Sequence, residues 1–278
     1  MNTDEYRYLG LVQHLPTSDE LPDSDDTPVD NEIQNLIPNL LLAVLALVWR
    51  DRQDWFLGVD MGIYYLYEQV RQPVLIPDGF LSVGVQRRKG DRGRLSYVLW
   101  EENNIPPVWA LEIVSKTVGG EYDQKLTKYA QLGVLYYVIY NPDYWRRDKH
   151  DPFEVYRLVE GEYIRQPGEP VWMPEAGLGI GRGIGTYEGW TREWLYWYDQ
   201  QGKRLLTPEE SLEKELQQAQ QMRQRAEQAE LQLNQERQQV QQSQQQAIAQ
   251  LLSLGLSGEQ IAGALGLSVQ EVKQAIAD

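Results

Sequence analysis

The segment at residues 108–142, VWALEIVSKTVGGEYDQKLTKYAQLGVLYYVIYNP, decides the fold of this chain. Its first part, 108–115, is a short and mostly apolar run, which is typical of a buried strand. Residues 121–133 have helical spacing and end at Gly133, a residue suited to a helix C-terminus. Residues 134–142 again predict a strand. The order strand, helix, strand predicts a crossover unit in a mixed sheet.

The residues before this segment predict one helix and several strands. Thr27-Pro28-Val29-Asp30 offers a capping hydroxyl, a proline suited to the first helical position and an acidic capping-box partner. We therefore expect a helix from there to about Arg52. Strands are predicted at 55–67, at 74–85 around a Pro-Asp-Gly turn, and at 96–102.

The residues after the segment predict further strands and exclude one kind of site. FEVYRLVEGEYIRQ at 153–166 predicts a hairpin around Glu160-Gly161-Glu162, and a tryptophan-rich segment ends the domain near residue 200. GLGIGRGIG at 177–185 superficially resembles a phosphate-binding loop. Because it does not lie in a strand-turn-helix unit, we exclude a dinucleotide site there.

The composition excludes several classes of protein and site. Of the 278 residues, 42% are hydrophobic and 24% charged, which is a globular balance and not a fibrous or disordered one. Cysteine is absent, which excludes disulfides and thiolate metal sites and fits a reducing cytoplasm. With two histidines, His14 and His150, chemistry must rest mainly on carboxylates and lysine. The most apolar stretch, 40–49, is too short to span a membrane.

The formal charge of −15 is concentrated at the two ends of the chain. Residues 1–31 carry −7 and residues 207–278 carry −5, so the middle of the chain is close to neutral. A strongly basic nucleic-acid footprint is absent, although a locally basic site remains open. RRKGDRGR at 87–94 is either a solvated hairpin or a loop that contacts phosphates.

These shifts in composition predict four parts. They are an acidic N-terminal arm (1–27), a main domain (28–206), a glutamine-rich helical or coiled-coil linker (207–250) and a small hairpin similar to a helix-turn-helix (251–278). The hairpin serves either packing and oligomerisation or the reading of DNA.

The linker has apolar residues at heptad-compatible spacing. Sixteen of the 34 residues from Gln217 to Gln250 are glutamine, and the apolar seam is weakened by Arg223, Glu230 and Arg237 at alternate core positions. We expect a helical spacer or a loose coiled coil, through which the chain could form a homo-oligomer. A disordered linker is the alternative.

Two carboxylates in the main domain stand where carboxylates are costly. Asp78 follows an Ile-Pro pair at a bend between strand segments, and Glu112 interrupts the apolar strand at 108–115. A buried carboxylate must be paired, hydrogen-bonded or bound to a metal. On neighbouring strands, the two would form a hard-oxygen site suited to Mg²⁺ or Mn²⁺.

A lysine on the following helix could complete this site. The ammonium of Lys125 could position an attacking water or stabilise a phosphate. Tyr129 lies four residues later and shares its helical face. Glu121, four residues earlier, could join the acidic cluster or pair with Lys125.

Five stretches of the chain carry a family resemblance, in the order VLIPDGFLSVGV, SYVLWEE, ALEIVS, GGEYDQKLTKYAQLGV and YYVIYNP. They resemble the Uma2 (DUF820) family of restriction-endonuclease-like proteins, of the cyanobacterial type, within the PD-(D/E)XK nuclease superfamily. The resemblance spans roughly residues 28–200. It implies a restriction-endonuclease-like α/β fold, with a central mixed sheet flanked by helices. It also implies an endonuclease that hydrolyses DNA phosphodiester bonds with Mg²⁺ (or Mn²⁺).

The resemblance also implies roles for particular residues. Asp78, Glu112 and the backbone carbonyl of Ile113 would be metal ligands, and Lys125 would be the catalytic lysine. The superfamily expects that lysine two residues after the glutamate, where this chain has Val114. The family's usual replacement, a lysine on the next helix, matches Lys125.

Three further residues remain open. Strand alternation puts Lys116 on the same face as Glu112, which makes it a rival for the catalytic lysine. Asp60 is either a third acidic member of the site or a strand-end aspartate that caps a turn. Glu32, on the first predicted helix, either reaches the site or is a solvated helix-face glutamate.

The leading hypothesis is thus a Mg²⁺-dependent endonuclease that acts on DNA. The presence of Val114 and the acidic charge motivate an alternative, a catalytically inactive nuclease-fold module for binding or assembly. A third hypothesis is a regulator that binds DNA through the C-terminal hairpin.

Overall fold

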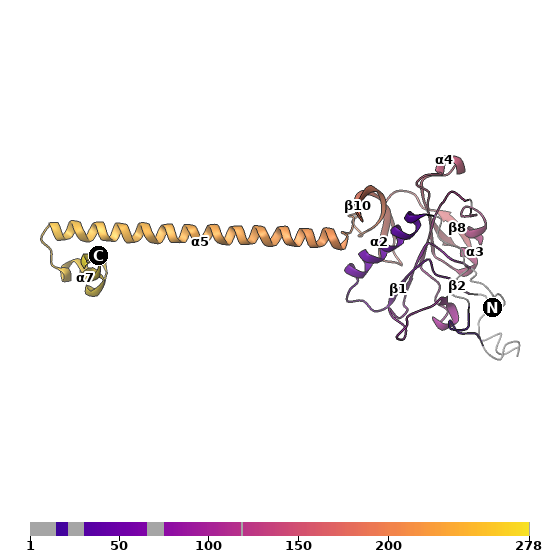
Figure 1. Ribbon diagram of the computed structural model, residues 1–278, viewed down its shortest axis with the longest axis horizontal. Coiled ribbons are helices and arrows are strands. Elements are labelled where there is room, and N and C mark those ends of the chain that lie inside the picture. Colours follow the sequence, from indigo (N-terminus) through magenta and orange to yellow (C-terminus); the bar gives the residue numbers. More distant parts are fainter. Residues whose placement is uncertain (1–14, 22–30, 66–74, 118, 278) are drawn as a thin grey trace. The chain divides into compact units, whose positions relative to one another are not determined.

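A six-stranded mixed sheet organises the larger part of the chain (Figure 1). The computed structural model describes residues 15–21, 31–65, 75–117 and 119–277. In spatial order the strands are β1 (Trp55–Val59), β3 (Gly79–Val83), β5 (Trp109–Ile113), β6 (Tyr136–Tyr140), β7 (Phe153–Val159) and β8 (Glu162–Arg165). Strands β5 and β6 are parallel, and all other neighbours in this sheet are antiparallel, so the predicted α/β fold with a mixed sheet is confirmed.

The predicted crossover unit is confirmed. Helix α3 (Gln124–Leu132) connects β5 to its parallel neighbour β6. The helix ends at Gly133, whose φ of 86° is left-handed and whose N–H donates to the carbonyls of Tyr129 and Ala130. A glycine adopts this backbone without steric cost, so the sequence marks where the crossover turns back to the sheet. A short helix, α4 (Trp145–Asp148), follows β6.

Alternation along β5 divides the core into two layers. Trp109, Leu111 and Ile113 pack into a cluster with α2 (Glu32–Val48), whereas Ala110 and Val114 join a cluster with α3. The two helices therefore cover opposite faces of the sheet (Figure 1). Because successive strand residues point to opposite faces, Glu112 is directed toward α3.

Helix α2 begins later and ends earlier than predicted. Asn31 has an extended backbone, and its side chain accepts hydrogen bonds from the N–H groups of Ile33 and Gln34 at 3.0 and 3.2 Å. It is thus the N-cap residue. The predicted cap at Thr27-Pro28-Val29-Asp30 lies outside the described residues, and the helix ends at Val48, not Arg52.

A second sheet packs over α2. It consists of β9 (Val171–Met173), β10 (Leu178–Tyr187) and β11 (Trp190–Tyr198), in the order β11-β10-β9. The indole N–H of Trp197 donates to the carbonyl of Leu41 at 2.9 Å, and its ring lies 5.0 Å from that of Trp109. The tryptophan-rich segment therefore closes the core on the α2 side.

The glycine-rich run 177–185 lies largely in strand β10, so it is not a phosphate-binding loop. Its glycines make room for tyrosine rings on β11. A Cβ on Gly185 would lie 2.1 Å from the hydroxyl of Tyr196, and one on Gly183 would lie 3.1 Å from that ring. The repeat is thus explained by close packing between strands.

Part of the predicted acidic arm is anchored to the domain. Two short parallel strands, β2 (Ile63–Tyr64) and β4 (Tyr97–Val98), pack with Leu21, which is buried. The indole N–H of Trp100, in the 3-10 turn η2 (Leu99–Glu101), donates to the carbonyl of Pro16 at 2.8 Å. Residues 15–21 of the predicted arm therefore pack against the main domain. Residues 1–14 and 22–27 of the predicted arm lie outside the described residues.

The basic loop at 87–94 is largely neutralised by acids. Arg94 makes two hydrogen bonds of 2.9 Å to the carboxylate of Glu102, and the two side chains are 2% and 5% exposed. Lys89 lies 2.8 Å from Glu101, and Arg92 lies 3.0 Å from Asp19. These pairs lower the attraction of the loop for phosphates, and the burial of Arg94 excludes a fully solvated hairpin.

The chain folds as two compact units, residues 1–209 and 210–278, and the second consists of helices. Helix α5 (Pro208–Ser253) continues through residue 250, so the disordered-linker alternative is wrong. Helices α6 (Gly258–Leu265) and α7 (Val269–Ala277) follow Ser257 and Ser268, whose hydroxyls accept hydrogen bonds from the first turn of each helix. They pack on the end of α5 through Ile248, Ile261, Ala262 and Val272. Across the described ranges, no helix is both long and apolar enough to cross a bilayer.

Arg94→Met tests the buried ion pair. The substitution leaves Glu102 buried with Lys89 as its remaining cation among the described residues, at 3.2 Å, so we expect a loss of about 3 kcal/mol in the free energy of unfolding, measured with urea. The control Arg92→Met removes an exposed pair and should cost less than about 0.5 kcal/mol. Equal losses in the two variants would contradict this interpretation.

Candidate active site

The first predicted carboxylate is placed by the pairing of two strands. Strand β3 begins at Gly79, which is paired with Leu111 of β5, so Asp78 lies beside the end of β5. Its Oδ2 accepts a hydrogen bond of 2.6 Å from the N–H of Ile113. The structure thus brings Asp78 next to Glu112 on the neighbouring strand, as the sequence predicted.

Glu112 is buried between two side chains of α3. It is 3% exposed, its Oε2 lies 2.8 Å from Nζ of Lys125, and its Oε1 accepts a hydrogen bond of 2.6 Å from the hydroxyl of Tyr129. Lys125 and Tyr129 are four residues apart and share a helical face. The glutamate is therefore paired through both of its oxygens, which offsets the cost of its burial.

The two carboxylates act on each other electrostatically. Burial raises the pKa of Asp78 well above its usual range, and the negative charges of Glu112 and Asp60 raise it further, against the opposing hydrogen bond from Ile113. Burial also raises the pKa of Glu112, and the ammonium of Lys125 opposes that rise. The site thus concentrates negative charge that a cation would stabilise.

Glu121 adds a further carboxylate beside Lys125. It is buried, its Oε1 lies 3.7 Å from Nζ of Lys125, and its backbone carbonyl accepts a hydrogen bond from the hydroxyl of Tyr137 at 2.9 Å. Burial tends to lower the pKa of Lys125, but the charges of Glu112, Glu121 and Asp78 outweigh it and raise that pKa. Lys125 is therefore a cation at neutral pH.

The three residues left open by the sequence have different places. Asp60 has a left-handed backbone (φ 46°), its N–H donates to the carbonyl of Asp78 at 3.2 Å, and its charge acts on that aspartate. It therefore lies next to the site. Lys116 is exposed beyond the end of β5, and Glu32 is exposed in the first turn of α2. The lysine that contacts Glu112 is Lys125.

The carbonyl of Ile113 has a partner that sequence reasoning missed. It accepts a hydrogen bond of 3.2 Å from the side-chain amide of Gln34, on α2. The sequence analysis considered Glu32, which is two residues earlier on the same helix. Two helical residues at this spacing point in very different directions, so only the placement of α2 on the sheet could select Gln34.

The donors at this site suit a hard divalent cation. Asp78, Glu112 and the carbonyl of Ile113 offer oxygen ligands, and Mg²⁺ is commonly held by one or two carboxylates with waters in its other positions. Among the residues described, no three or more acidic, histidine or cysteine side chains are grouped so as to hold a metal ion. The site therefore offers the type of oxygen ligand that such an ion prefers, although the number of acidic ligands is small.

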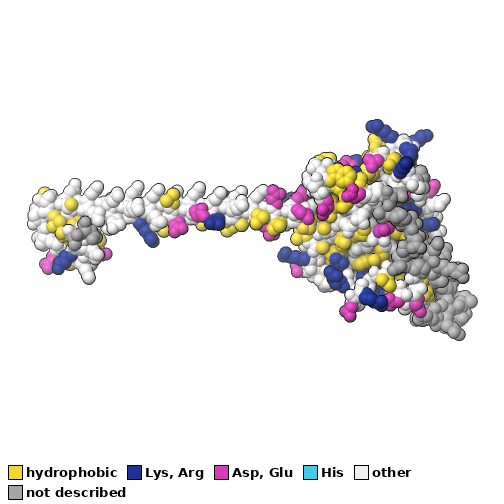
Figure 2. Space-filling view, viewed as in Figure 1, with side chains coloured by type: hydrophobic (Ala, Val, Ile, Leu, Met, Phe, Trp, Pro, Cys, Tyr) yellow, Lys and Arg dark blue, Asp and Glu magenta, His cyan; other side chains and the backbone are white. Residues whose placement is uncertain are grey.

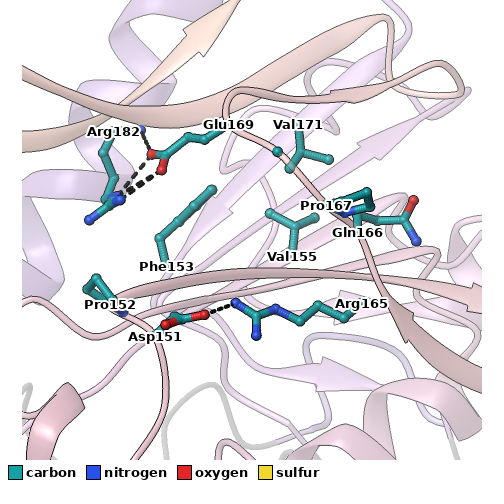
Figure 3. A pocket seen from close by; sticks show the side chains of 11 residues that line it. Asp151, Pro152, Phe153, Val155, Arg165, Gln166, Pro167, Glu169, Val171 and Arg182 are labelled. Carbon is teal, nitrogen blue, oxygen red and sulfur yellow. Dashed lines mark hydrogen bonds and ion pairs between the residues drawn. The ribbon is translucent and has the colours of Figure 1, made fainter.

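A pocket of about 700 Å³ lies away from these residues (Figure 3). Phe153, Val155 and Val171 are among its apolar lining residues. Of its two arginines, Arg182 lies 2.8 Å from Glu169, and Arg165 pairs with Asp151. The acids that face these arginines disfavour an anionic ligand there.

The comparison with protein families agrees with the sequence resemblance. The Uma2 family model, described as a putative restriction endonuclease, matches residues 26–185, which is more than half of the chain. The crystal structure of a putative nuclease belonging to DUF820 from Anabaena variabilis is similar with a TM-score of 0.39 and 16% identity, and the match covers 58% of this chain and 90% of that one. No protein with a curated description matches.

The variant Asp78→Asn tests the repulsion between the carboxylates. Between the ordinary pKa of an aspartate and the raised pKa of Asp78, the folded protein binds more protons than the unfolded chain. The free energy of unfolding therefore falls as the pH rises through this interval. In EDTA we expect the variant to be more stable than the wild type near pH 8, and the difference to shrink as the pH falls toward about 4.

Urea unfolding at several pH values measures this difference. Asp91→Asn, in the exposed part of the basic loop, is the matched control. The proposed repulsion would be contradicted if the difference in unfolding free energy between Asp78→Asn and the wild type did not change with pH. It would also be contradicted if the control variant showed an equally large difference.

Proposed function

The chain belongs to the Uma2 family, and from this premise we propose that it is a divalent-metal-dependent endonuclease that hydrolyses DNA phosphodiester bonds. The observation that carries the proposal is the buried Glu112, held between Lys125 and Tyr129 and next to Asp78. An acid pair that can hold a metal ion, beside an ammonium group, is an arrangement suited to hydrolysis at phosphorus.

Asp78, Glu112 and the carbonyl of Ile113 would hold Mg²⁺ or Mn²⁺, with Asp60 as a candidate additional ligand. When bound, the ion would supply an acidified water and neutralise charge that develops on the phosphate. Gln34 supports this set, because its hydrogen bond fixes the direction of the Ile113 carbonyl. Tyr129 supports it too, because it fixes one oxygen of Glu112.

Lys125 has the charge and the access to act on a phosphate. Its ammonium has three hydrogen-bond donors, of which one is directed at Glu112. The side chain is 26% exposed, so another donor can reach a substrate oxygen. At that position the ammonium would orient the attacking water or stabilise negative charge in the transition state.

The valine in the superfamily's lysine position is compatible with this proposal. Val114 is 2% exposed and packs in the cluster beneath α3. An ammonium at this point would be buried among apolar groups. Lys125 reaches Glu112 from α3 instead, which favours an active enzyme over the inactive-module alternative.

Nicking of supercoiled plasmid DNA with Mg²⁺ or Mn²⁺ tests the proposal. Asp78→Ala, Glu112→Gln and Lys125→Met should each lower the rate by at least about 100-fold, because each removes a group that acts on the reacting atoms. Lys128→Met, an exposed lysine on the same helix as Lys125, is the matched control and should keep the wild-type rate. Wild-type protein that is no more active than these three variants would exclude the proposal, and activity lost equally in Lys128→Met would contradict the assignment of Lys125.

A second proposal concerns assembly, and it rests on helix α5. Over its 46 residues, Ile248 is the one buried position among those described. Apolar side chains lie exposed along it, including Leu212 (58%) and Val240 (57%) (Figure 2). Such residues at heptad spacing favour a coiled coil with a second copy of the chain.

The charged residues in this seam favour one direction of pairing. In a parallel pair in register, Arg223, Glu230 and Arg237 would each face their own copy across the core. Like charges that meet there are destabilising. An antiparallel pair can place these residues opposite apolar ones, so we propose a loose antiparallel homodimer.

The DNA-reading alternative for the hairpin has less support, because Lys273 is its one basic residue.

Val240→Glu combined with Leu233→Glu tests the assembly. Light scattering should give the mass of a dimer for the wild type and about 32 kDa for the variant, because the new carboxylates would lie in the seam. Gln238→Glu with Gln242→Glu, which adds the same charge outside the seam, should remain dimeric. A monomeric wild type would rule out the assembly.

A further inference from the structure

A second group of basic residues lies where strand β6 ends. Arg146 and Arg147 are on α4, Lys149 follows it, and Lys116 lies just beyond β5. All four side chains are exposed. Figure 2 shows basic side chains protruding from the domain where Figure 1 labels α4. The sequence analysis considered only the loop at 87–94 as a basic site.

These cations differ from those of the 87–94 loop in having few acids to neutralise them. Arg147 pairs with Asp148 at 2.6 Å. Over the part of the chain that the structure describes, Lys116, Arg146 and Lys149 form no ion pair with an acid. Asp143 and Asp148 are the acids of segment 143–149, so this patch is locally positive in a chain of net charge −15. We call Lys116, Arg146 and Lys149 the basic patch.

The basic patch borders the carboxylate site. Because β5 and β6 are parallel, their carboxyl ends meet at one edge of the sheet, the edge at which Asp78 and Glu112 lie. Arg147 donates from Nη1 to the carbonyl of Lys116 at 2.8 Å and from Nη2 to that of Ser115 at 3.4 Å. These bonds tie the segment that follows β5 to α4, so Lys116 and Arg146 belong to one surface.

The chemistry of the patch suits a phosphate backbone. The guanidinium of Arg146 lies 4.8 Å from the ring centre of Trp145, which restrains it while its N–H groups stay exposed. Arginine and lysine at the surface bind phosphate oxygens without regard to base sequence. A phosphodiester at the carboxylates would continue along its strand past the neighbouring surface.

We propose that the basic patch binds the phosphate backbone of duplex DNA and positions the strand at the carboxylate pair. The inference rests on the proposed nuclease function and identifies how its substrate is held. Arg147 is a positioning residue that fixes the patch. The 87–94 loop, whose cations largely face acids, contributes little.

Fluorescence anisotropy with a labelled DNA duplex in EDTA tests the proposal, since binding is then measured without cleavage. Arg146→Ala with Lys149→Ala should weaken binding at least roughly tenfold near 0.1 M salt. It should also reduce the slope of log K against log salt by about two, because each phosphate contact contributes about 0.9. Arg88→Ala with Arg92→Ala is the matched control, with the same change in charge on an exposed part of the other loop, and should bind as the wild type does.

The outcomes separate this proposal from the nuclease proposal. The proposal for the basic patch is overturned if the wild-type protein does not bind the duplex in EDTA at low salt. It is also overturned if the control variant weakens binding as much as the test variant does. If the wild type binds through the patch but nicks no plasmid with either ion, the nuclease proposal fails while the phosphate surface stands. In active protein, the test variant should raise KM and leave kcat within roughly threefold.

Discussion

The pairing of one buried carboxylate organises this structure. Glu112 lies one residue before the end of β5, whose other residues are apolar, and burial of an unpaired carboxylate there would be strongly unfavourable. Lys125 and Tyr129 reduce that penalty by binding its two oxygens. Both come from α3, so the crossover helix must dock with one particular face on the sheet. The pairing thus specifies the packing of α3 as well as the position of the ammonium group.

The same arrangement leaves the site with unbalanced charge. One lysine faces Glu112 and Glu121, while Asp78 and Asp60 lie across the strand from it. A protein selected for stability alone would have fewer acids here. An excess of acidic groups around one lysine is the property that would attract a divalent cation, so the cost in stability and the proposed activity have one physical origin.

Charge is distributed unevenly in the rest of the molecule too. The cations of the 87–94 loop face acids, and Arg94 is buried, so that loop is mainly structural. The cations near α4 are exposed at the edge where β5 and β6 end. Two segments of similar composition therefore have different physical roles, and pairing with acids, not the number of bases, makes the difference.

Much of this could be predicted from the sequence, because it depends on local patterns. Apolar runs, the left-handed glycine after α3 and the spacing of Lys125 and Tyr129 determine the crossover unit and the face that carries the site. Residues that meet only through packing could not be predicted. Gln34 reaches the carbonyl of Ile113 because α2 docks at a particular angle, and Arg94 is buried because Glu102 lies opposite it. Such contacts join residues that do not belong to one helix or strand, and their free energy exists only once these segments have packed together, whereas strand and helix periodicity is a property of neighbouring residues.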